Sequence, residues 1–277
     1  MTSQQIYFIH ALSPLHAGTG QGTGVIDLPI AREKATNIPI FPASSLKGAM
    51  RELCNDNKEA DKIFGAGGDF GCQGSVLFSD AHLLLLPVRS IKGVFAWVTC
   101  PYVLNRFCRD FMKDAESPII KDNNKCIIPE DSVLQTSDGK VYLEEIDLKA
   151  EKDEMLPPLN KIRDIFSDAR KNDFNQHFCI VSDDVFSFLL TTSMEIVARI
   201  KIDDKSKTTQ KGSLWYEEAL PVESVLYGIA VLSSVPKAGL SDDVLKEKLK
   251  ICSERTVQLG GKTTVGRGLC KVTFADI

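Results

Sequence analysis

Apolar residues recur along the chain at two spacings, one typical of strands and one typical of helices, and the two alternate. Alternation within 4–12 predicts a first strand with Tyr7 and Ile9 on one face. Helical spacing within 44–56 predicts a helix whose cap is Ser44 or Ser45. The chain therefore opens as a strand, a long glycine-rich stretch and a helix.

The same two spacings continue to the end of the chain. Helices are predicted at 183–193 and at 241–255, where Ser241 precedes two aspartates. Strands are predicted within 75–86, 94–100, 177–182, 224–234, 256–261 and 269–276. This β-α-β-β-α-β order predicts an α+β fold with a ferredoxin-like or RRM-like sheet. Length alone leaves open whether the 277 residues form one domain with large insertions, which we expect, or two domains.

Two segments interrupt that order. Residues 105–176 are charged and loop-rich with one convincing strand, KVYLEEIDL, so we expect an insertion that forms a finger-like or partner-facing subdomain. Residues 196–221 have two strand-like arms around a polar, lysine-rich tip, which predicts a β-hairpin at about 199–216 that projects from the body.

Composition narrows the class of protein. Hydrophobic residues make up 43% of the chain and charged residues 25%, as in folded globular proteins. The N-terminus lacks a basic run followed by an apolar one, and the apolar stretch at 83–88 contains Pro87 and is too short for a bilayer, so we expect no membrane segment. Eight cysteines without a C-x-x-C pair predict reduced thiols, a cytoplasmic location and no zinc site.

Charge weighs against a nucleic-acid binder that works alone, because the net charge is −4. Helical spacing nevertheless places Lys47 and Arg51 together on one polar face that can meet a polyanion. Other basic residues also lie close to the glycine-rich and hairpin segments: Lys201, Lys205, Lys207, Lys211, Lys262 and Arg267. An RNA-binding role would thus require basic groups on one face and partner subunits.

The glycine-rich motifs exclude two nucleotide-binding classes. The tail GGKTTVGRG has Thr256 where a P-loop requires glycine, and GTGQGTG at 18–24 has Thr23 or Val25 where a dinucleotide fingerprint requires its third glycine. Gly260 and Gly261, with Lys262 and Arg267, would let backbone amides approach a phosphate chain. A surface turn between two strands is the commoner use of such a motif.

Candidate chemistry is sparse. His16 could pair with Asp27 as acid and base if the loop folds back, or it could make one local hydrogen bond, and Asp27 could equally be a turn aspartate. Glu217 and Glu218, like the aspartates at 203–204, could bind a divalent cation, but solvated charges at the hairpin base are the simpler interpretation. Residue spacing alone therefore names no reaction.

Six motifs in order do carry a resemblance: SPLHAGTG, GVIDLPIARE, IPIFPASSLKGAMR, DAHLLLLPVRS, LWYEEALP and QLGGKTTVGRG. Together they cover both ends and the middle of the chain, and they resemble the RAMP superfamily. Within it, IDLPIARE and PVRS are similar to the backbone subunit of type III-B (Cmr) CRISPR effector complexes. One departure is Ala43, where glycine is expected before the two serines.

The resemblance implies a hand-like protein with an RRM-type palm, inserted fingers at 105–176 and a hairpin thumb at 199–216. Copies of it would stack along a CRISPR RNA together with other subunits of the complex, and the thumb would flip one nucleotide per subunit. The RNA contacts implied for the palm and thumb are Ser44, Ser45, Lys47, Arg51, Lys205, Lys207, Gly260, Gly261, Lys262 and Arg267.

The resemblance also implies cleavage of the bound target RNA by Asp27, which would bind Mg²⁺ or another divalent cation, with His16 assisting. Two alternatives remain open. One is a non-catalytic RNA scaffold, as in type III-A backbones. The other is an endoribonuclease that processes CRISPR precursor RNA through a histidine-centred, metal-independent site.

Overall fold

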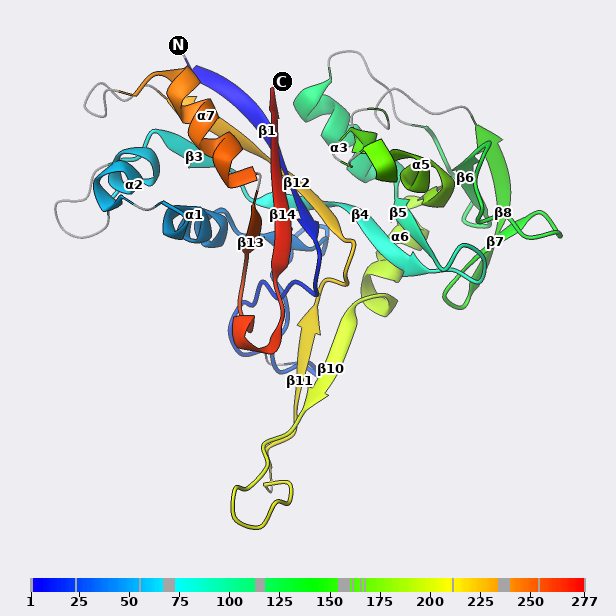
Figure 1. Ribbon diagram of the computed structural model, residues 1–277. Coiled ribbons are helices and arrows are strands. Elements are labelled where there is room, and N and C mark those ends of the chain that lie inside the picture. Colours follow the sequence, from blue (N-terminus) through cyan, green and yellow to red (C-terminus); the bar gives the residue numbers. More distant parts are fainter. Residues whose placement is uncertain are drawn as a thin grey trace.

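The central strand β1 (Thr2–Ala11) is paired along both edges in a computed structural model (Figure 1). It runs antiparallel to β12 (Val225–Ser233) on one side and to β14 (Leu269–Asp276) on the other, and β12 pairs in turn with β4 (Ala81–Arg89). The structure describes residues 2–22, 24–54, 56–66, 73–112, 118–153, 160, 162–164, 166, 168–210, 212–233, 240–253 and 255–276.

Two helices complete the palm. Helix α1 (Ala43–Glu52) lies between β1 and β4 in the chain, and α7 (Asp242–Ser253) lies between β12 and β14. The sheet order β14-β1-β12-β4 with these connections is that of a ferredoxin-like fold, so the predicted fold class is confirmed. Short strands extend or flank this sheet: β2 (Ile40–Phe41), β3 (Val76–Phe78) and β13 (Thr256–Gln258).

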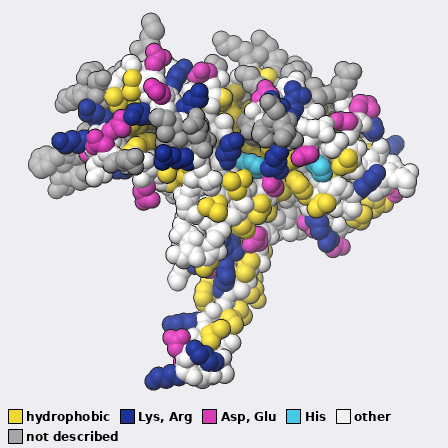
Figure 2. Space-filling model, in the orientation of Figure 1, with side chains coloured by type: hydrophobic (Ala, Val, Ile, Leu, Met, Phe, Trp, Pro, Cys, Tyr) yellow, Lys and Arg dark blue, Asp and Glu magenta, His cyan; other side chains and the backbone are white. Residues whose placement is uncertain are grey.

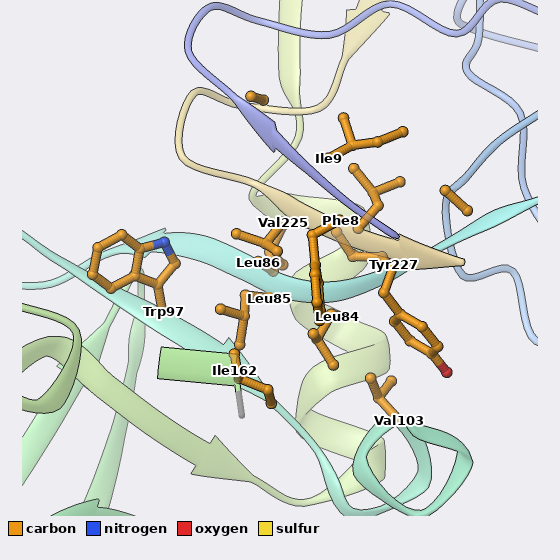
Figure 3. Close-up of a cluster of buried hydrophobic side chains, with 14 of the residues drawn as sticks. Phe8, Ile9, Leu84, Leu85, Leu86, Trp97, Val103, Ile162, Val225 and Tyr227 are labelled. Atoms are coloured by element: carbon orange, nitrogen blue, oxygen red, sulfur yellow. The ribbon is translucent and has the colours of Figure 1, made fainter. Parts of the chain in front are cut away.

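Both faces of the sheet are covered, which explains its apolar strands. On one face the Tyr7 ring lies 5.7 Å from Phe78, and on the other Phe8 lies 6.3 Å from Phe107, a residue of the inserted segment. Residues 83–86, four consecutive leucines in β4, are fully buried, and Figure 3 shows three of them packed among Phe8, Trp97 and Tyr227. A continuous apolar run of this kind is typical of a strand buried on both sides.

The segment 105–176 is more regular than we expected. KVYLEEIDL is two strands rather than one, because the chain turns at Glu144, whose φ is 47°. The helix in which residue 105 lies begins earlier, at Pro101, and its buried positions recur every three to four residues. The elements are α3 (Pro101–Phe111), β6 (Lys125–Pro129), β7 (Lys140–Leu143), β8 (Ile146–Asp153) and α5 (Asp168–His177).

This insertion continues the main sheet. Strand β9 (Phe178–Val181) pairs with both β5 (Phe95–Thr99) and β6, so the sheet runs from the palm into the fingers, and helix α6 (Asp183–Thr192) follows β9. Ser182 caps α6 through its side chain, as acidic residues after a serine predict. No helix in the described part of the chain is long and apolar enough to span a bilayer.

The start of α1 differs from the prediction. The helix begins at Ala43, and neither Ser44 nor Ser45 caps it; Asp80 takes that role, because its Oδ1 accepts a hydrogen bond from the Ala43 N–H at 2.8 Å. The two serines are therefore left exposed in the first turn. Ala43 has helical backbone, so the alanine in place of glycine causes no strain there. Helix α2 (Asn57–Phe64), which Asp56 caps, was not predicted.

A tight contact inside the sheet yields a stability prediction. Gly228 lies opposite Tyr7 in the β1–β12 pair, and a Cβ there would approach the Tyr7 hydroxyl oxygen to 2.4 Å. Because Tyr7 is fully buried and donates to the Ser79 carbonyl at 2.6 Å, it has little room to move. We expect Gly228→Ala to lower the free energy of unfolding by roughly 1–3 kcal/mol, measured by urea denaturation.

The matched control is Gly48→Ala, at an exposed position of α1 where a Cβ meets nothing within 4 Å. Alanine should stabilise that helix by up to about 1 kcal/mol, because it loses less conformational entropy than glycine. Similar effects of the two substitutions would contradict the packing argument.

Candidate nucleic-acid interface

A hairpin projects from the body at the segment where the sequence predicts one (Figure 1). Its strands β10 (Glu195–Arg199) and β11 (Trp215–Ala219) pair antiparallel, and an isolated bridge between Ile202 and Thr209 continues the arms toward the tip. Regular pairing thus lies at the base of the predicted span 199–216. Lys211 lies outside the described residues.

The arms of the hairpin expose aliphatic side chains. Ile200, Ile202 and Leu214 are each about half exposed, at 49%, 55% and 54%. Figure 2 shows hydrophobic side chains along the hairpin and basic ones near its tip, where Lys205 and Lys207 are exposed. These two lysines therefore lie apart from the basic residues of the palm.

The glycine-rich loop between β1 and β2 is held against strand β11 by backbone hydrogen bonds. The Leu28 N–H donates to the Tyr216 carbonyl at 3.1 Å, and the Leu28 carbonyl accepts from the Glu218 N–H at 3.0 Å. Leu15 and Leu220 exchange two further bonds of 2.9 Å. A loop rich in glycine thereby acquires a fixed path beside the hairpin.

Three distant segments meet in a cavity of about 680 Å³. The loop, the first turn of α1 and the glycine-rich tail line it, and they contribute six predicted RNA-binding or catalytic residues: His16, Ser44, Ser45, Gly260, Gly261 and Lys262. Glycine is required at 260, because its φ is +72° and a Cβ would lie 2.4 Å from the His16 carbonyl oxygen. The sequence motifs at 44–45 and 260–262 thus form one surface.

This cavity, which we call the palm groove, offers hydrogen-bond donors. The backbone N–H groups of Ser44 and Lys262 have no hydrogen-bond partner within the described part of the chain. The N-terminal turn of a helix also carries a partial positive charge that favours anions. The palm groove is therefore suited to a phosphate backbone.

His16 lies in the wall of the palm groove and is only 6% exposed. Its Nδ1 lies 2.6 Å from the Glu218 carbonyl oxygen, which can only accept, so Nδ1 carries the hydrogen. In the neutral ring Nε2 is then the free acceptor. A Cβ on Gly18 would lie 2.6 Å from Nε2, so the glycine allows the ring to occupy this place.

Asp27 lines a second cavity of about 560 Å³, together with Gly22, Trp215 and Lys262. The side chain is exposed; its Oδ2 accepts from the Tyr216 N–H at 2.7 Å, and its Oδ1 has no hydrogen-bond partner among the residues described. Lys262 lines both cavities, so they adjoin. Asp27 and His16 thus line adjoining cavities, and no hydrogen bond joins these two described side chains.

Glu217 corrects the expectation of solvated carboxylates at the hairpin base. It is 2% exposed, and its Oε1 accepts from Lys262 Nζ and Trp215 Nε1, each at 2.8 Å, while Arg199 Nε lies 3.4 Å from Oε2. Burial opposes ionisation, but the bonds from Lys262 and Trp215 and the charge of Arg199 outweigh it and lower the pKa of Glu217 to about 2. Two cations around one carboxylate leave one net positive charge.

Glu218 is buried as well, at 4% exposure, on the opposite face of the strand. Its Oε1 accepts from Arg32 Nη2 at 2.5 Å and its Oε2 from the Ile30 N–H at 3.0 Å. Sequence reasoning missed both Arg32 and the buried glutamates. The available signal was that neighbouring residues on a strand face opposite sides, so Glu217 and Glu218 cannot share one solvent-exposed face.

Two predicted RNA contacts are committed to other partners. Arg51 donates to the Asp61 carboxylate and to the Gly65 carbonyl, so it ties α1 to α2 instead of offering a free charge beside Lys47. Arg267 is 4% exposed and lies 3.3 Å from Glu195, at the hairpin base. Both residues remain predicted RNA contacts, but each cation is already paired with a carboxylate within the chain.

Acidic groups at the hairpin tip serve local structure. Asp203 accepts from the backbone N–H groups of Lys205 and Ser206 at 3.0 and 2.8 Å, which shapes the tip turn. Across the described ranges, no group of three or more His, Cys, Asp or Glu residues is placed to enclose a metal ion. Any cation at Asp27 would need ligands from a bound molecule.

Comparison with known proteins agrees with this architecture. A model of the RAMP superfamily matches residues 8–271. The Cmr endoribonuclease Cmr4 of Pyrococcus furiosus is 36% identical over 284 residues, which cover 97% of this chain and 95% of that protein. The Cmr subunit Cmr4 of Saccharolobus solfataricus is 28% identical over 98% of this chain and 96% of that protein.

Solved structures show the same fold. Oligomeric Cmr4 from Pyrococcus furiosus superposes with a TM-score of 0.78 at 31% identity, over 99% of this chain and 98% of that one. A chain of the type III-B Cmr-β complex bound to cognate target RNA superposes with a TM-score of 0.74 at 23% identity, over 98% of this chain and 96% of that one. By fold, motifs and full-length similarity, the chain belongs to the RAMP superfamily and, within it, to the Cmr4 family of type III-B CRISPR effector subunits.

Proposed function

We propose that this chain is the repeated backbone subunit of a type III-B CRISPR effector complex, which binds CRISPR RNA and cleaves the complementary target RNA. The observation that carries the proposal is the place of Asp27. An exposed carboxylate with one free oxygen lies between the palm groove and the base of the projecting hairpin, in a full-length relative of a Cmr endoribonuclease. Its partners are CRISPR RNA, target RNA, further copies of itself and other subunits, and its compartment is the cytoplasm.

The palm groove would hold the guide strand. Its free backbone donors and serine hydroxyls can bind phosphates without reading sequence, and the Lys262–Glu217–Arg199 cluster adds one net positive charge beside it. The exposed aliphatic arms of the hairpin can enter between stacked bases, and a nucleotide displaced there leaves A-form geometry. Its 2′-hydroxyl can then align with the adjacent phosphorus.

Asp27 would act on that displaced nucleotide. The free Oδ1 would orient the 2′-hydroxyl or take its proton as the O2′–P bond forms and the P–O5′ bond breaks. The departing 5′-oxygen would take up a proton from water, which yields a cyclic phosphate and a 5′-hydroxyl. The Tyr216 N–H on Oδ2 fixes the direction of the carboxylate. His16 lines the adjoining groove, where its Nε2 can accept from an RNA hydroxyl.

A divalent cation fits this site on chemical grounds. Mg²⁺ is commonly held by one or two carboxylates plus substrate phosphates and water, and Asp27 supplies one exposed carboxylate. When bound, the cation would offset charge that develops on the phosphate. We therefore propose metal-dependent cleavage with Asp27 as the protein ligand.

Asp27→Asn tests the catalytic assignment. Asparagine keeps an oxygen for the Tyr216 N–H but removes the charge, so guide binding and assembly should stay near wild type while cleavage falls by about 10²–10⁴-fold. Complexes reconstituted with labelled target RNA and Mg²⁺ would give cleavage rates alongside gel-shift affinities. Asp131→Asn, an exposed carboxylate of the insertion, is the control. Wild-type rates in the Asp27 variant would mean that Asp27 is structural and that the cleaving residue lies elsewhere in the complex.

Chelation tests the metal. EDTA should stop cleavage by the wild-type complex and excess Mg²⁺ should restore it, with guide binding unchanged, because the palm groove contacts need no cation. EDTA that is already saturated with Mg²⁺ serves as the control. Cleavage that continues in EDTA would favour the precursor-processing alternative, centred on His16.

Lys262→Ala tests the palm groove. Removing this lysine takes away the net positive charge of the cluster, so guide affinity should fall for every sequence and the slope of log K against log salt should shrink by about 0.7. Fluorescence titrations at several salt concentrations measure both quantities. Lys58→Ala, on the exposed start of α2, should change neither. An unchanged slope in the Lys262 variant would remove this lysine from the RNA interface.

A further inference from the structure

One residue joins the hairpin, the palm groove and the Asp27 loop. The Glu218 backbone N–H donates to the Leu28 carbonyl, and its backbone carbonyl accepts from His16 Nδ1. Its side chain accepts from the Ile30 N–H through Oε2 and from Arg32 through Oε1. Glu218, a residue of the hairpin strand β11, is therefore bonded to the loop at residue 28 and at two residues that follow it, and also to the histidine of the groove.

Arg32 extends this link into the body. Its Nη1 donates to the Asn37 carbonyl at 3.0 Å, and its Nη2 also reaches the Leu190 carbonyl of α6 at 3.3 Å. The side chain is 16% exposed, so its guanidinium and the Glu218 carboxylate form a largely buried ion pair. A planar guanidinium can serve several acceptors at fixed angles, which a lysine cannot.

We propose that Glu218 is a positioning residue for target cleavage: its carboxylate, through Ile30 and Arg32, fixes the Asp27 loop on the hairpin strand. This inference rests on the proposed function. The loop around Asp27 is rich in glycine, which gives it little intrinsic stiffness. A displacement of about 1 Å at a reacting group can lower a rate by about 100-fold. The bonds that hold the Asp27 loop in place therefore control the rate of cleavage.

Glu218 holds the Asp27 loop mainly through its side chain but holds His16 through its backbone, so the two effects can be tested apart. His16 is bonded to the Glu218 backbone. Of the three hydrogen bonds between the Asp27 loop and Glu218, the backbone makes one, to Leu28, and the side chain makes two, to Ile30 and Arg32. A side-chain substitution therefore leaves the His16 contact in place and loosens the loop. Guide binding and cleavage should respond differently, which a general loss of structure would not produce.

Glu218→Gln is the main variant. Glutamine has nearly the same volume but places one N–H₂ donor against either the Ile30 N–H or the Arg32 guanidinium, so one contact becomes repulsive. We expect the single-turnover cleavage rate of the reconstituted complex to fall by 10- to 100-fold at saturating target RNA. Guide and target affinities should stay within about twofold of wild type.

Substitutions of Arg32 provide a second test, because they leave Glu218 itself unchanged. Arg32→Gln should slow cleavage like Glu218→Gln, and Arg32→Lys, which keeps the charge but loses the fork, should lie between Arg32→Gln and wild type. The double variant Glu218→Gln/Arg32→Gln should be no slower than the slower single variant if the two side chains act as one unit. Arg89→Gln, which breaks an exposed pair with Glu144 far from the loop, is the control.

Wild-type cleavage in both Glu218→Gln and Arg32→Gln overturns the proposal, as does a parallel loss of guide affinity and cleavage. Should Glu218→Gln fail to fold, the order of the three Arg32 proteins decides the matter alone. The proposed function is tested separately: it fails if the wild-type complex does not cleave, or if Asp27→Asn cleaves normally, whatever Glu218→Gln does.

Discussion

Two neighbouring carboxylates on one short strand are both buried, and each must be neutralised on its own face of β11. A buried carboxylate without a partner is strongly destabilising, so its donors cannot be optional. Glu217 takes its donors from the glycine-rich tail and the hairpin, and Glu218 takes its donors from the Asp27 loop. Two segments that are far apart in the sequence, the tail and the Asp27 loop, are thereby fixed to the hairpin base.

This requirement explains why the presumed catalytic elements lie where they do. The pairing of β1 with β14 places the start of the 13–39 loop beside the tail, and α1 contacts the neighbouring strand β13. Further along the described part of this loop, backbone hydrogen bonds join Leu15 to Leu220 and Leu28 to β11. The buried pairs supply the remaining constraint, and they place Asp27 beside the hairpin that would displace a target nucleotide.

Most of the palm was predictable from the spacing of apolar residues alone. Its strands have alternating apolar and polar residues or are continuously apolar, and its helices carry an apolar stripe. Segment 105–176 was harder to predict. The strands at 140–153 have only one buried face, and their charged residues are typical of a loop unless the turn at Glu144 is recognised. At the candidate interface, the glycine and serine motifs that the sequence singled out do line one cavity, because a close approach of backbone requires glycine and so leaves a sequence signature. The partners of Arg51 and Arg267 were not predicted, because the pairing of a cation with one particular carboxylate leaves no sequence signature.

The contacts of the basic side chains also explain how a chain with a negative net charge can bind RNA. The net charge of −4 gives no overall attraction for a polyanion at long range, and Arg51, Arg267 and Arg32 are bonded to internal carboxylates. The palm groove offers short-range donors instead, from backbone amides and hydroxyls with one net charge at its edge. Copies arranged along one guide strand add such contacts on a single ligand, so that each further copy binds at a high effective concentration. A mildly acidic subunit can therefore form a tight RNA assembly, because affinity comes from repetition and not from the charge of any one chain.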